Sequence, residues 1–186
     1  MSYLDKIIQS RRSTYLKDFN QDDISEVEIE ELLNLALYAP SHKKTKPWRF
    51  VVLRGEENIS KLGEELTNLY LKHTPSEAFS ETKHKGMKAK VMQANTAIAI
   101  VVNFSGKVPE WEEKVAVGMA VQNLWLKATE MNIGGYWSSP KFIFHLNDFL
   151  GLAKHQKCIG LFYLGRSTDK PTKSREEDNE DFVTYF

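Results

Sequence analysis

Apolar residues recur at helical spacing along several stretches of the chain, which predicts helices with one buried face. At the amino end, Leu4, Ile7 and Ile8 share such a face, so a short first helix brings Arg11 to its carboxyl end. The same spacing predicts two longer helices further on, over Glu56–Lys72 and Glu112–Met131.

A second helix is marked by both of its ends. Ser25 is followed three residues later by Glu28, the capping-box pattern in which side chains and backbone satisfy each other at a helix start. Its end is expected near Tyr38, because Pro40 disfavours helical geometry in the residue before it.

Short apolar runs predict the strands. Thr96–Asn103 is a continuous run rich in alanine, isoleucine and valine, which is typical of a strand buried on both faces. Three further strands are predicted over Arg49–Arg54, Tyr136–Ser138 and Cys158–Gly165. Helices and strands alternate irregularly, so we expect a central sheet wrapped by helices, in a single domain over residues 1–186.

Three stretches fit this pattern less well. Thr74–Lys90 is polar and rich in lysine, and we interpret it as a mobile excursion with some helix. A short helix is expected from about Asn147. The chain ends with a charged stretch from Pro171 and then the aromatic segment Phe182–Phe186, which is unfavourable in water and should dock on its own domain or on a partner chain.

The composition is that of an ordinary globular protein, with 41% apolar and 27% charged residues. The formal net charge is zero, so no overall field favours nucleic acid or an anionic membrane. The single cysteine, Cys158, excludes an internal disulfide and fits a reducing compartment. Because the amino-terminal helix carries Asp5 and Lys6 rather than a secretory signal, we expect a cytoplasmic protein.

Membrane and metal binding are not expected either. The longest apolar run, Ala97–Val102, is too short to span a bilayer. His155 and Cys158 have the spacing of metal ligands, but no second pair accompanies them.

Three polar clusters carry the candidate chemistry, and two of them stand where an apolar helix ends. Their members are Arg11, Arg12 and Ser13, then His42, Lys44 and Lys46, then Gly134, Gly135, Trp137, Ser138 and Ser139.

These residue types match the demands of flavin mononucleotide (FMN). A phosphate dianion is best met by arginine forks and hydroxyls, which the first cluster supplies. The polar edge of the ring needs hydrogen-bond donors and a nearby cation, which the second cluster supplies. The glycines permit close approach of the ring, and the serines can donate near its reactive centre. Each cluster alone has a plainer explanation, since a basic pair at a helix end also complements the helix dipole and Trp48 and Trp137 would usually be core residues.

Six motifs together carry a family resemblance that spans essentially the whole chain. They are Arg11–Ser13, Ala39–Lys43 with Pro47-Trp48, Val108–Glu112, Gly134–Trp137 with Ser139, Leu161–Gly165 and Phe182–Phe186. With these motifs in this order, the chain resembles the nitroreductase family of FMN-dependent oxidoreductases, and most of all its minimal, single-domain bacterial branch.

The resemblance implies an α+β fold with a mainly antiparallel sheet, and a C-terminal strand that extends to the partner subunit of a homodimer. It implies that FMN lies at the subunit interface, in contact with Arg11–Ser13 of one chain and His42 of the other. Trp137–Ser139 would lie along the ring. The stretch that matches Lys127–Asn132 is associated with the nicotinamide donor.

Some positions need separate comment. Arg166, by position and charge, is interpreted as an extra phosphate ligand. Lys44 and Lys46 stand where most members of the family carry asparagine and glutamine, so contacts to the ring edge are expected to differ. Tyr38 stands where the minimal branch can carry a basic flavin contact, and we expect stacking or no contact there.

The first functional hypothesis is therefore an enzyme with a ping-pong mechanism. NADH or NADPH reduces FMN and leaves, and a small electron acceptor such as a nitroaromatic or a quinone then enters the same slot. No side chain is expected to be an indispensable acid or base. A flavin-binding or flavin-buffering protein without turnover is the alternative, and an interaction module that uses the aromatic tail is a third reading.

Overall fold

The computed structural model describes residues 1–20, 22–167 and 182–186. The described residues form a four-stranded antiparallel sheet in the order β1-β2-β4-β3. The strands are β1 (Trp48–Arg54), β2 (Thr96–Asn103), β3 (Ile133–Ser138) and β4 (Gln156–Arg166). The four strands predicted from apolar runs are present, and the expected antiparallel sheet is confirmed.

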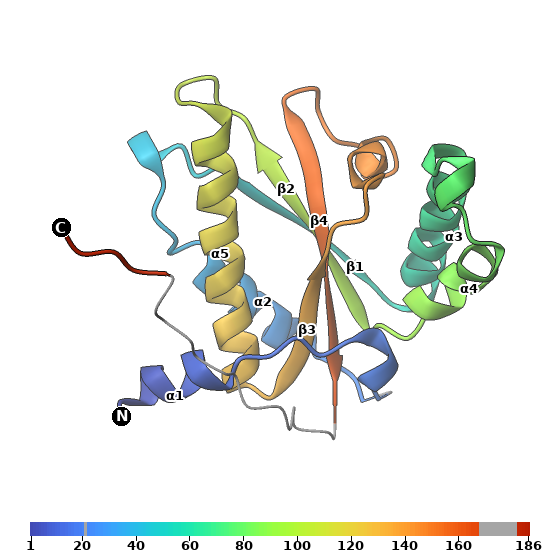
Figure 1. Ribbon diagram of the computed structural model, residues 1–186. Coiled ribbons are helices and arrows are strands. Elements are labelled where there is room, and N and C mark those ends of the chain that lie inside the picture. The colour runs from blue at the N-terminus through green and yellow to red at the C-terminus, as the bar shows by residue number, and fades with distance from the viewer. Residues whose placement is uncertain (21, 168–181) are drawn as a thin grey trace.

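Helices cover both faces of the sheet, which gives the α+β arrangement seen in Figure 1. They are α1 (Tyr3–Ser10), α2 (Glu26–Ala36), α3 (Glu56–His73), α4 (Glu81–Val91) and α5 (Glu110–Glu130). Short 3₁₀ turns lie between them: η1 (Leu16–Asp18), η2 (His42–Lys44), η3 (Ser76–Ala78) and η4 (Ile143–Asn147). α2 and α5 cover one face, and α3 and α4 lie on the other.

The central strand β2 shows why both faces are covered. Successive side chains of a strand point to opposite faces. Ile98 and Ile100 join the core on the side of α2 and α5, whereas Ala97 and Ala99 join the core on the side of α3. All four are fully buried, so the prediction of a strand buried on both faces is confirmed.

Local signals place the helix ends as expected. Ser25 Oγ accepts a hydrogen bond from the backbone of Glu28 (3.3 Å), and Glu28 Oε2 accepts one from the backbone of Ser25 (2.9 Å), so the capping box of α2 is formed. Trp48 is 5% exposed in the core, and Cys158 is a buried residue of β4, as predicted for both.

The lysine-rich stretch is more regular than expected, because most of it forms η3 and the three-turn helix α4. Ser80 caps α4, and Lys88 reaches Glu64 of α3 (2.5 Å between Nζ and Oε1). A Cβ on Gly63 would lie only 3.2 Å from the Cα of Lys88, so the two helices pack closely at this glycine. The sequence does not predict this helix clearly, because few apolar residues mark its face.

The short helix expected from about Asn147 was placed too late, since η4 ends at that residue. Ile143 and Leu146 are buried and anchor the turn. Asn147 Oδ1 accepts a hydrogen bond from the backbone of Cys158 (2.9 Å), which ties the end of the turn to β4.

The aromatic end of the chain is exposed. Phe182 is 82% and Tyr185 is 91% exposed, and residues 182–186 form no strand within this single chain (Figure 1). The polar linker predicted ahead of them, residues 171–181, lies outside the described residues. In the described part of the chain, no helix has the length and apolar character needed to cross a bilayer.

Candidate functional site

The arginine pair follows α1 and lies against the carboxyl-terminal half of α5. Arg11 caps α1, and its guanidinium lies 4.3 Å from the centre of the Trp125 ring, a cation–π contact. Arg12 Nη1 donates to the backbone oxygens of Gln9 (2.6 Å) and Arg11 (3.0 Å). The structure thus gathers two guanidinium groups at the end of α1, where the sequence predicted them.

The next residues run along β3. The backbone of Thr14 donates to Gly135 O (3.1 Å). A Cβ on Gly134 would lie 2.9 Å from Thr14 Cβ, and one on Gly135 would lie 2.6 Å from Phe162 Cε1. The two glycines therefore make room for the chain itself, which passes β3 in close contact at Thr14.

An apolar pocket of about 350 Å³ opens between α4 and the end of β3. Tyr136 and Ser138 line it from β3, and Lys83 and Lys90 line it from α4. Its other lining residues are Leu16, Leu66, Gly86, Met87, Val91, Pro140, Phe142 and Tyr163. No carboxylate is among these described lining residues, so we refer to this site as the lysine pocket.

Sequence reasoning missed the contribution of α4 to this pocket. Lys83, Gly86, Met87 and Lys90 are spaced i, i+3, i+4 and i+7, which puts them on one helix face. That spacing is visible in the sequence, but the face is polar, and a polar, lysine-rich stretch favours the interpretation as a mobile excursion.

The tyrosines of the pocket stay protonated. Burial, with a smaller effect of Tyr15, raises the pKa of Tyr136 to about 12, and a hydrogen bond with Ser138 opposes this shift. Burial also raises the pKa of Tyr163. The ring centres of Tyr15 and Tyr136 lie 5.0 Å apart. The neutral phenol of Tyr136 can therefore donate a hydrogen bond at physiological pH.

Trp137 points to the other face of the sheet. It packs beside the core under α2 and α5, and its indole occupies the space where a Cβ on Gly160 would stand. The structure therefore does not bring Trp137 into the lysine pocket with Ser138. Ser139 follows β3 directly and is exposed.

The loop that carries His42, Lys44 and Lys46 is firmly shaped. His42 Nδ1 lies 2.6 Å from Glu112 Oε2 at the start of α5. Ser41 Oγ accepts a hydrogen bond from the backbone of Lys46 (3.1 Å). Lys44 and Lys46 have φ angles of +54° and +46°, a left-handed conformation that non-glycine residues adopt at a cost.

This loop lies far from the arginine pair of the same chain. Arg11 contacts Trp125 and His42 contacts Glu112, and these α5 residues are thirteen positions apart. At 1.5 Å per residue they are separated by about 20 Å along the helix. Within one chain, the first and second predicted clusters are not brought together.

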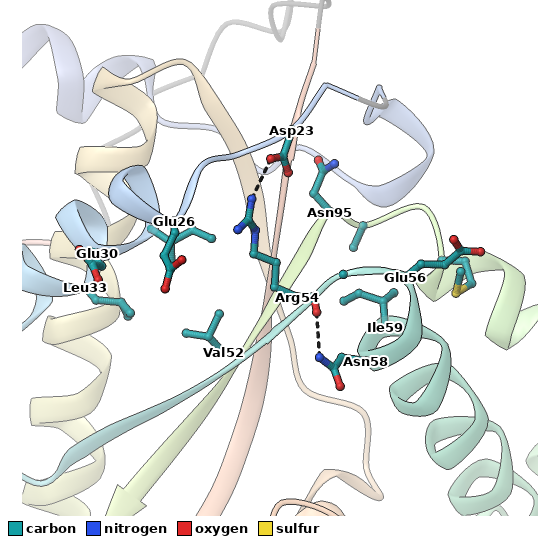
Figure 2. A pocket seen from close by; sticks show the side chains of 14 residues that line it. Asp23, Glu26, Glu30, Leu33, Val52, Arg54, Glu56, Asn58, Ile59 and Asn95 are labelled. Atoms are coloured by element: carbon teal, nitrogen blue, oxygen red, sulfur yellow. Dashed lines mark hydrogen bonds and ion pairs between the residues drawn. The ribbon is translucent and has the colours of Figure 1, made fainter.

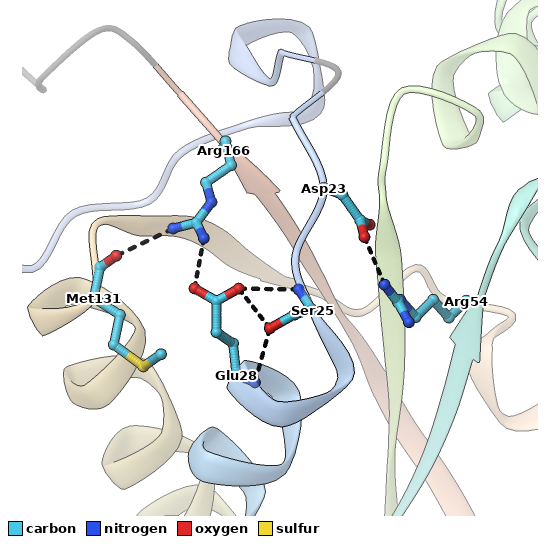
Figure 3. A network of polar contacts seen from close by, with 6 residues as sticks. All are labelled: Asp23, Ser25, Glu28, Arg54, Met131 and Arg166. Carbon is cyan, nitrogen blue, oxygen red and sulfur yellow. Dashed lines mark hydrogen bonds and ion pairs between the residues drawn. The ribbon is translucent and has the colours of Figure 1, made fainter.

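Arg166 is engaged in a network at the end of β4 (Figure 3). Its Nη2 lies 2.5 Å from Glu28 Oε1, and its Nη1 donates to Met131 O (3.3 Å). Hydrogen bonds, first from the backbone of Ser25 and then from Arg166, lower the pKa of Glu28. A phosphate at Arg166 would have to compete with this carboxylate.

The stretch predicted to meet the nicotinamide donor connects α5 to β3. Lys127 Nζ pairs with Glu31 (2.7 Å) and Glu130 (2.6 Å), and hydrogen bonds to these carboxylates, Glu130 foremost, raise its pKa. Lys127 is therefore already neutralised by its own chain.

A second cavity, of about 1010 Å³, lies between β1 and the starts of α2 and α3 (Figure 2). Four carboxylates line it: Asp23, Glu26, Glu30 and Glu56. Arg54 is the one cationic residue among its described lining residues, and its Nη2 is paired with Asp23 Oδ2 (2.7 Å). We refer to this cavity as the acidic cavity.

The fold and the clusters agree with a family match. A family model described as the Nitroreductase family matches residues 8–166, most of the chain, so the chain belongs to the nitroreductase family. The predicted resemblance, the fold class and the assignment to a family of oxidoreductase enzymes are thereby confirmed.

Two bacterial relatives match most of the chain and most of their own length. YdjA of Escherichia coli K12, provisionally named an NAD(P)H nitroreductase, is 30% identical over 166 residues, which cover 86% of this chain and 87% of YdjA. YfhC of Bacillus subtilis 168, named in the same way, is 26% identical over 186 residues, or 98% of this chain and 94% of YfhC.

Solved structures share the fold. A nitroreductase-like family protein from Bacillus cereus superposes with a TM-score of 0.83 at 21% identity, covering 100% of this chain and 97% of that one. A nitroreductase with bound FMN from Bacteroides fragilis NCTC 9343 superposes with a TM-score of 0.77 at 18% identity, covering 100% of both chains.

Proposed function

We propose that the protein is an FMN-dependent oxidoreductase that uses NADH or NADPH, with the flavin ring in the lysine pocket. The observation that carries the proposal is an apolar pocket of about 350 Å³ beside Ser138 whose charged lining residues, Lys83 and Lys90, are both cations. Its volume falls in the range of about 300–1,000 Å³ of small-ligand sites. The FMN in the Bacteroides fragilis structure and the names of the bacterial relatives support the same cofactors.

The residues present fit FMN by their donor chemistry. Arg11, Arg12 and Ser13 would hold the phosphate through charge-assisted hydrogen bonds. Tyr136 and Ser138 would meet the ring from β3. Arg166 belongs to the phosphate site only if it leaves Glu28, and we keep it as a weaker ligand.

The side chains bind, orient and polarise. When FMN is bound, the chemistry it supplies is acceptance of hydride from a nicotinamide and delivery of electrons to a second substrate that enters afterwards. The ammonium of Lys90 stabilises negative charge that develops at the edge of the pocket. The apolar wall formed by Leu16, Leu66 and Val91 excludes water from that charge.

We further propose a homodimer, in which His42, Lys44, Lys46 and the exposed Ser139 complete the site of the partner chain or its rim. The distance of about 20 Å along α5 supports this, because His42 cannot share one ring with Arg11 of the same chain. The rim of α5 also exposes apolar side chains at four-residue intervals. These are Trp111, Val115 and Met119, at 64%, 52% and 38% exposure.

The aromatic tail and Tyr38, 82% exposed, extend the apolar surface that a second copy would cover. Trp137 supports the sheet from behind rather than the ring itself. Nitroaromatics and quinones are the acceptors we propose, and the single cysteine supports a cytoplasmic location.

Visible spectroscopy tests the cofactor and the reaction. The purified protein should be yellow, and anaerobic mixing with NADH or NADPH should bleach the flavin absorbance within seconds. Flavin that stays oxidised with both donors would favour the flavin-buffering alternative. A colourless protein that gains no thermal protection from added FMN would contradict the proposal.

Sedimentation tests the dimer. Val115→Arg should yield a monomer that loses flavin, because a buried unpaired charge is costly. Leu71→Arg is the matched control, since Leu71 is a similarly exposed apolar residue (57%) on α3. A Val115→Arg variant that remains a flavin-loaded dimer would exclude this face as the interface.

A further inference from the structure

The four lysines of α4 fall into two groups. Lys85 is paired with Glu81 (3.1 Å) and Lys88 with Glu64 (2.5 Å). Lys83 and Lys90 line the pocket, and neither has a carboxylate of the described residues within ion-pair distance. The helix therefore pairs two of its lysines with carboxylates and leaves the positive charges of Lys83 and Lys90 at the pocket.

We infer that Lys83 makes the lysine pocket selective for electron acceptors that carry a carboxylate or a similar anionic group. This inference rests on the proposed function, because it names the substrate class of that same site. We assign this selectivity to Lys83 rather than to Lys90 because of their different positions in the pocket.

The two lysines stand at opposite ends of the pocket-facing stripe. Seven residues of helix separate them by about 10 Å along α4. Lys90 is next to the end of the helix, where the chain passes close to η1 and so to the segment that begins with the arginine pair (Figure 1). Gly86 lies between them, and a Cβ there would meet no atom within 4 Å. A flat ring can therefore lie against the middle of the stripe while Lys83 meets a group beyond it.

The ammonium of Lys83 is held in place by an aromatic cluster. Lys83 Nζ lies 4.9 Å from the centre of the Tyr70 ring. Tyr70 is fixed in turn, since its hydroxyl accepts a hydrogen bond from the backbone of Ser80 (2.9 Å) and its ring meets Phe142 edge-on at 6.1 Å. Phe142 also lines the pocket, so the exposed ammonium of Lys83 stands beside an apolar wall.

An ammonium beside such a wall favours one class of ligand. A neutral aromatic gains only apolar contact there, whereas an aromatic carboxylate gains that contact and a charge-assisted hydrogen bond. No carboxylate among the described lining residues opposes an incoming anion. The geometry thus matches a flat ring with an acidic substituent at one end.

The experiment compares 4-nitrobenzoate with 4-nitrobenzamide in the flavin-loaded protein. The two acceptors have nearly the same size and differ in charge. The ratio of their kcat/KM values should fall about tenfold in Lys83→Gln, as expected for loss of a charge-assisted contact. Lys85→Gln is the matched control on the same helix, and its ratio should equal that of the unmodified protein. Comparing ratios between variants cancels the intrinsic difference in reactivity.

Binding is measured separately with benzoate, which is not reduced. Calorimetric titration should show about tenfold weaker binding of benzoate to Lys83→Gln, with no change in Lys85→Gln. This measurement needs no turnover, so it tests Lys83 even if the proposed reaction fails. Failure of the proposed function is seen instead as absence of flavin, or of bleaching by nicotinamide.

Three results would overturn the inference. One is an acceptor ratio and a benzoate affinity that do not change in Lys83→Gln. Another is an equal change in Lys85→Gln, which would indicate only a general field. The third is a loss confined to FMN affinity or to the preference between NADPH and NADH, which would assign Lys83 to those ligands.

Discussion

The acidic cavity and the lysine pocket differ in size and in charge. Their charge, rather than their size, indicates which of them suits a phosphate-bearing ligand. The acidic cavity has about 1010 Å³ and four carboxylates, and the lysine pocket has about 350 Å³ and two lysines. Glu26 and Glu56 occupy the first turns of α2 and α3, where carboxylates stabilise the helix dipole. The acidic lining thus has a structural explanation, and a phosphate-bearing ligand would be repelled there.

The larger cavity is therefore not the better candidate for the FMN site. The lysine pocket is lined by Ser138 and by two lysines of α4, Lys83 and Lys90, that are not paired with a carboxylate of the described residues.

The largest effect is expected from Gly160→Ala, which disturbs the packing between β4 and Trp137 of β3 behind the lysine pocket. The added Cβ would collide with Trp137, whose indole fills that space and backs β3. Overpacking against a ring held in the core should lower the free energy of unfolding by about 3 kcal/mol. Urea denaturation measures this loss, and Gly86→Ala is the control, because its Cβ meets no atom. Equal stability of Gly160→Ala and the unmodified protein would show that Trp137 is loosely packed.

The next largest effect concerns FMN retention, which should depend on the arginines near the amino end and not on the arginine of the acidic cavity. Arg11→Ala or Arg12→Ala should weaken FMN retention about tenfold or more, because a charge-assisted phosphate contact contributes about 1.5–3 kcal/mol. Arg54→Ala removes an arginine from the acidic cavity and should leave FMN retention unchanged. Flavin release followed by fluorescence compares all three variants. Unchanged retention in both amino-terminal variants would refute their assignment to the phosphate.

A smaller effect concerns alkaline pH. The pKa of Tyr136 is raised to about 12, so the folded chain keeps this proton after the unfolded chain has lost it near the ordinary value of 10.0. Its contribution to stability is therefore complete below about pH 10 and is lost as the pH rises toward 12. The slope is at most about 1.4 kcal/mol per pH unit, and smaller for a half-buried ring. Tyr136→Phe should flatten this part of a urea-derived stability profile, and an identical profile would contradict the burial of the phenol.

The smallest effect is expected from Lys90→Gln. A partly solvated charge contributes about 1 kcal/mol or less, so FMN retention should weaken by about fivefold at most, and more at low salt than at high salt. Lys88→Gln is the control on the same helix, because Lys88 faces Glu64 instead. If both variants retain flavin equally well, Lys90 does not act on the cofactor.

Local patterns in the sequence predicted most of the fold. The capping box of α2 and the continuous burial of β2 depend on neighbouring residues, and both are present as expected. The helix α4 was not predicted clearly, because its pocket-facing side carries lysine, glycine and methionine rather than an apolar stripe. Its order comes from contact with α3, which no local pattern records.

The site was less predictable, because its contacts join distant residues. His42 meets Glu112 seventy positions away, and Arg166 meets Glu28 at a separation of 138. The sequence identified residues with the right chemistry, but not which of them share a space. Trp137 and Ser138 are adjacent in sequence, yet the pleat of β3 sends them to opposite faces of the sheet.

The length of α5 has a genetic consequence. Arg11 and His42 contact residues near its two ends, so in the proposed homodimer a shared site would take Arg11 from one chain and His42 from the other. In a heterodimer of one chain that lacks Arg11 and one chain that lacks His42, both defects would fall in the same site, and the other site would keep both residues. Co-expression of the two defective alleles should restore one intact catalytic unit per heterodimer, whereas neither allele alone restores any.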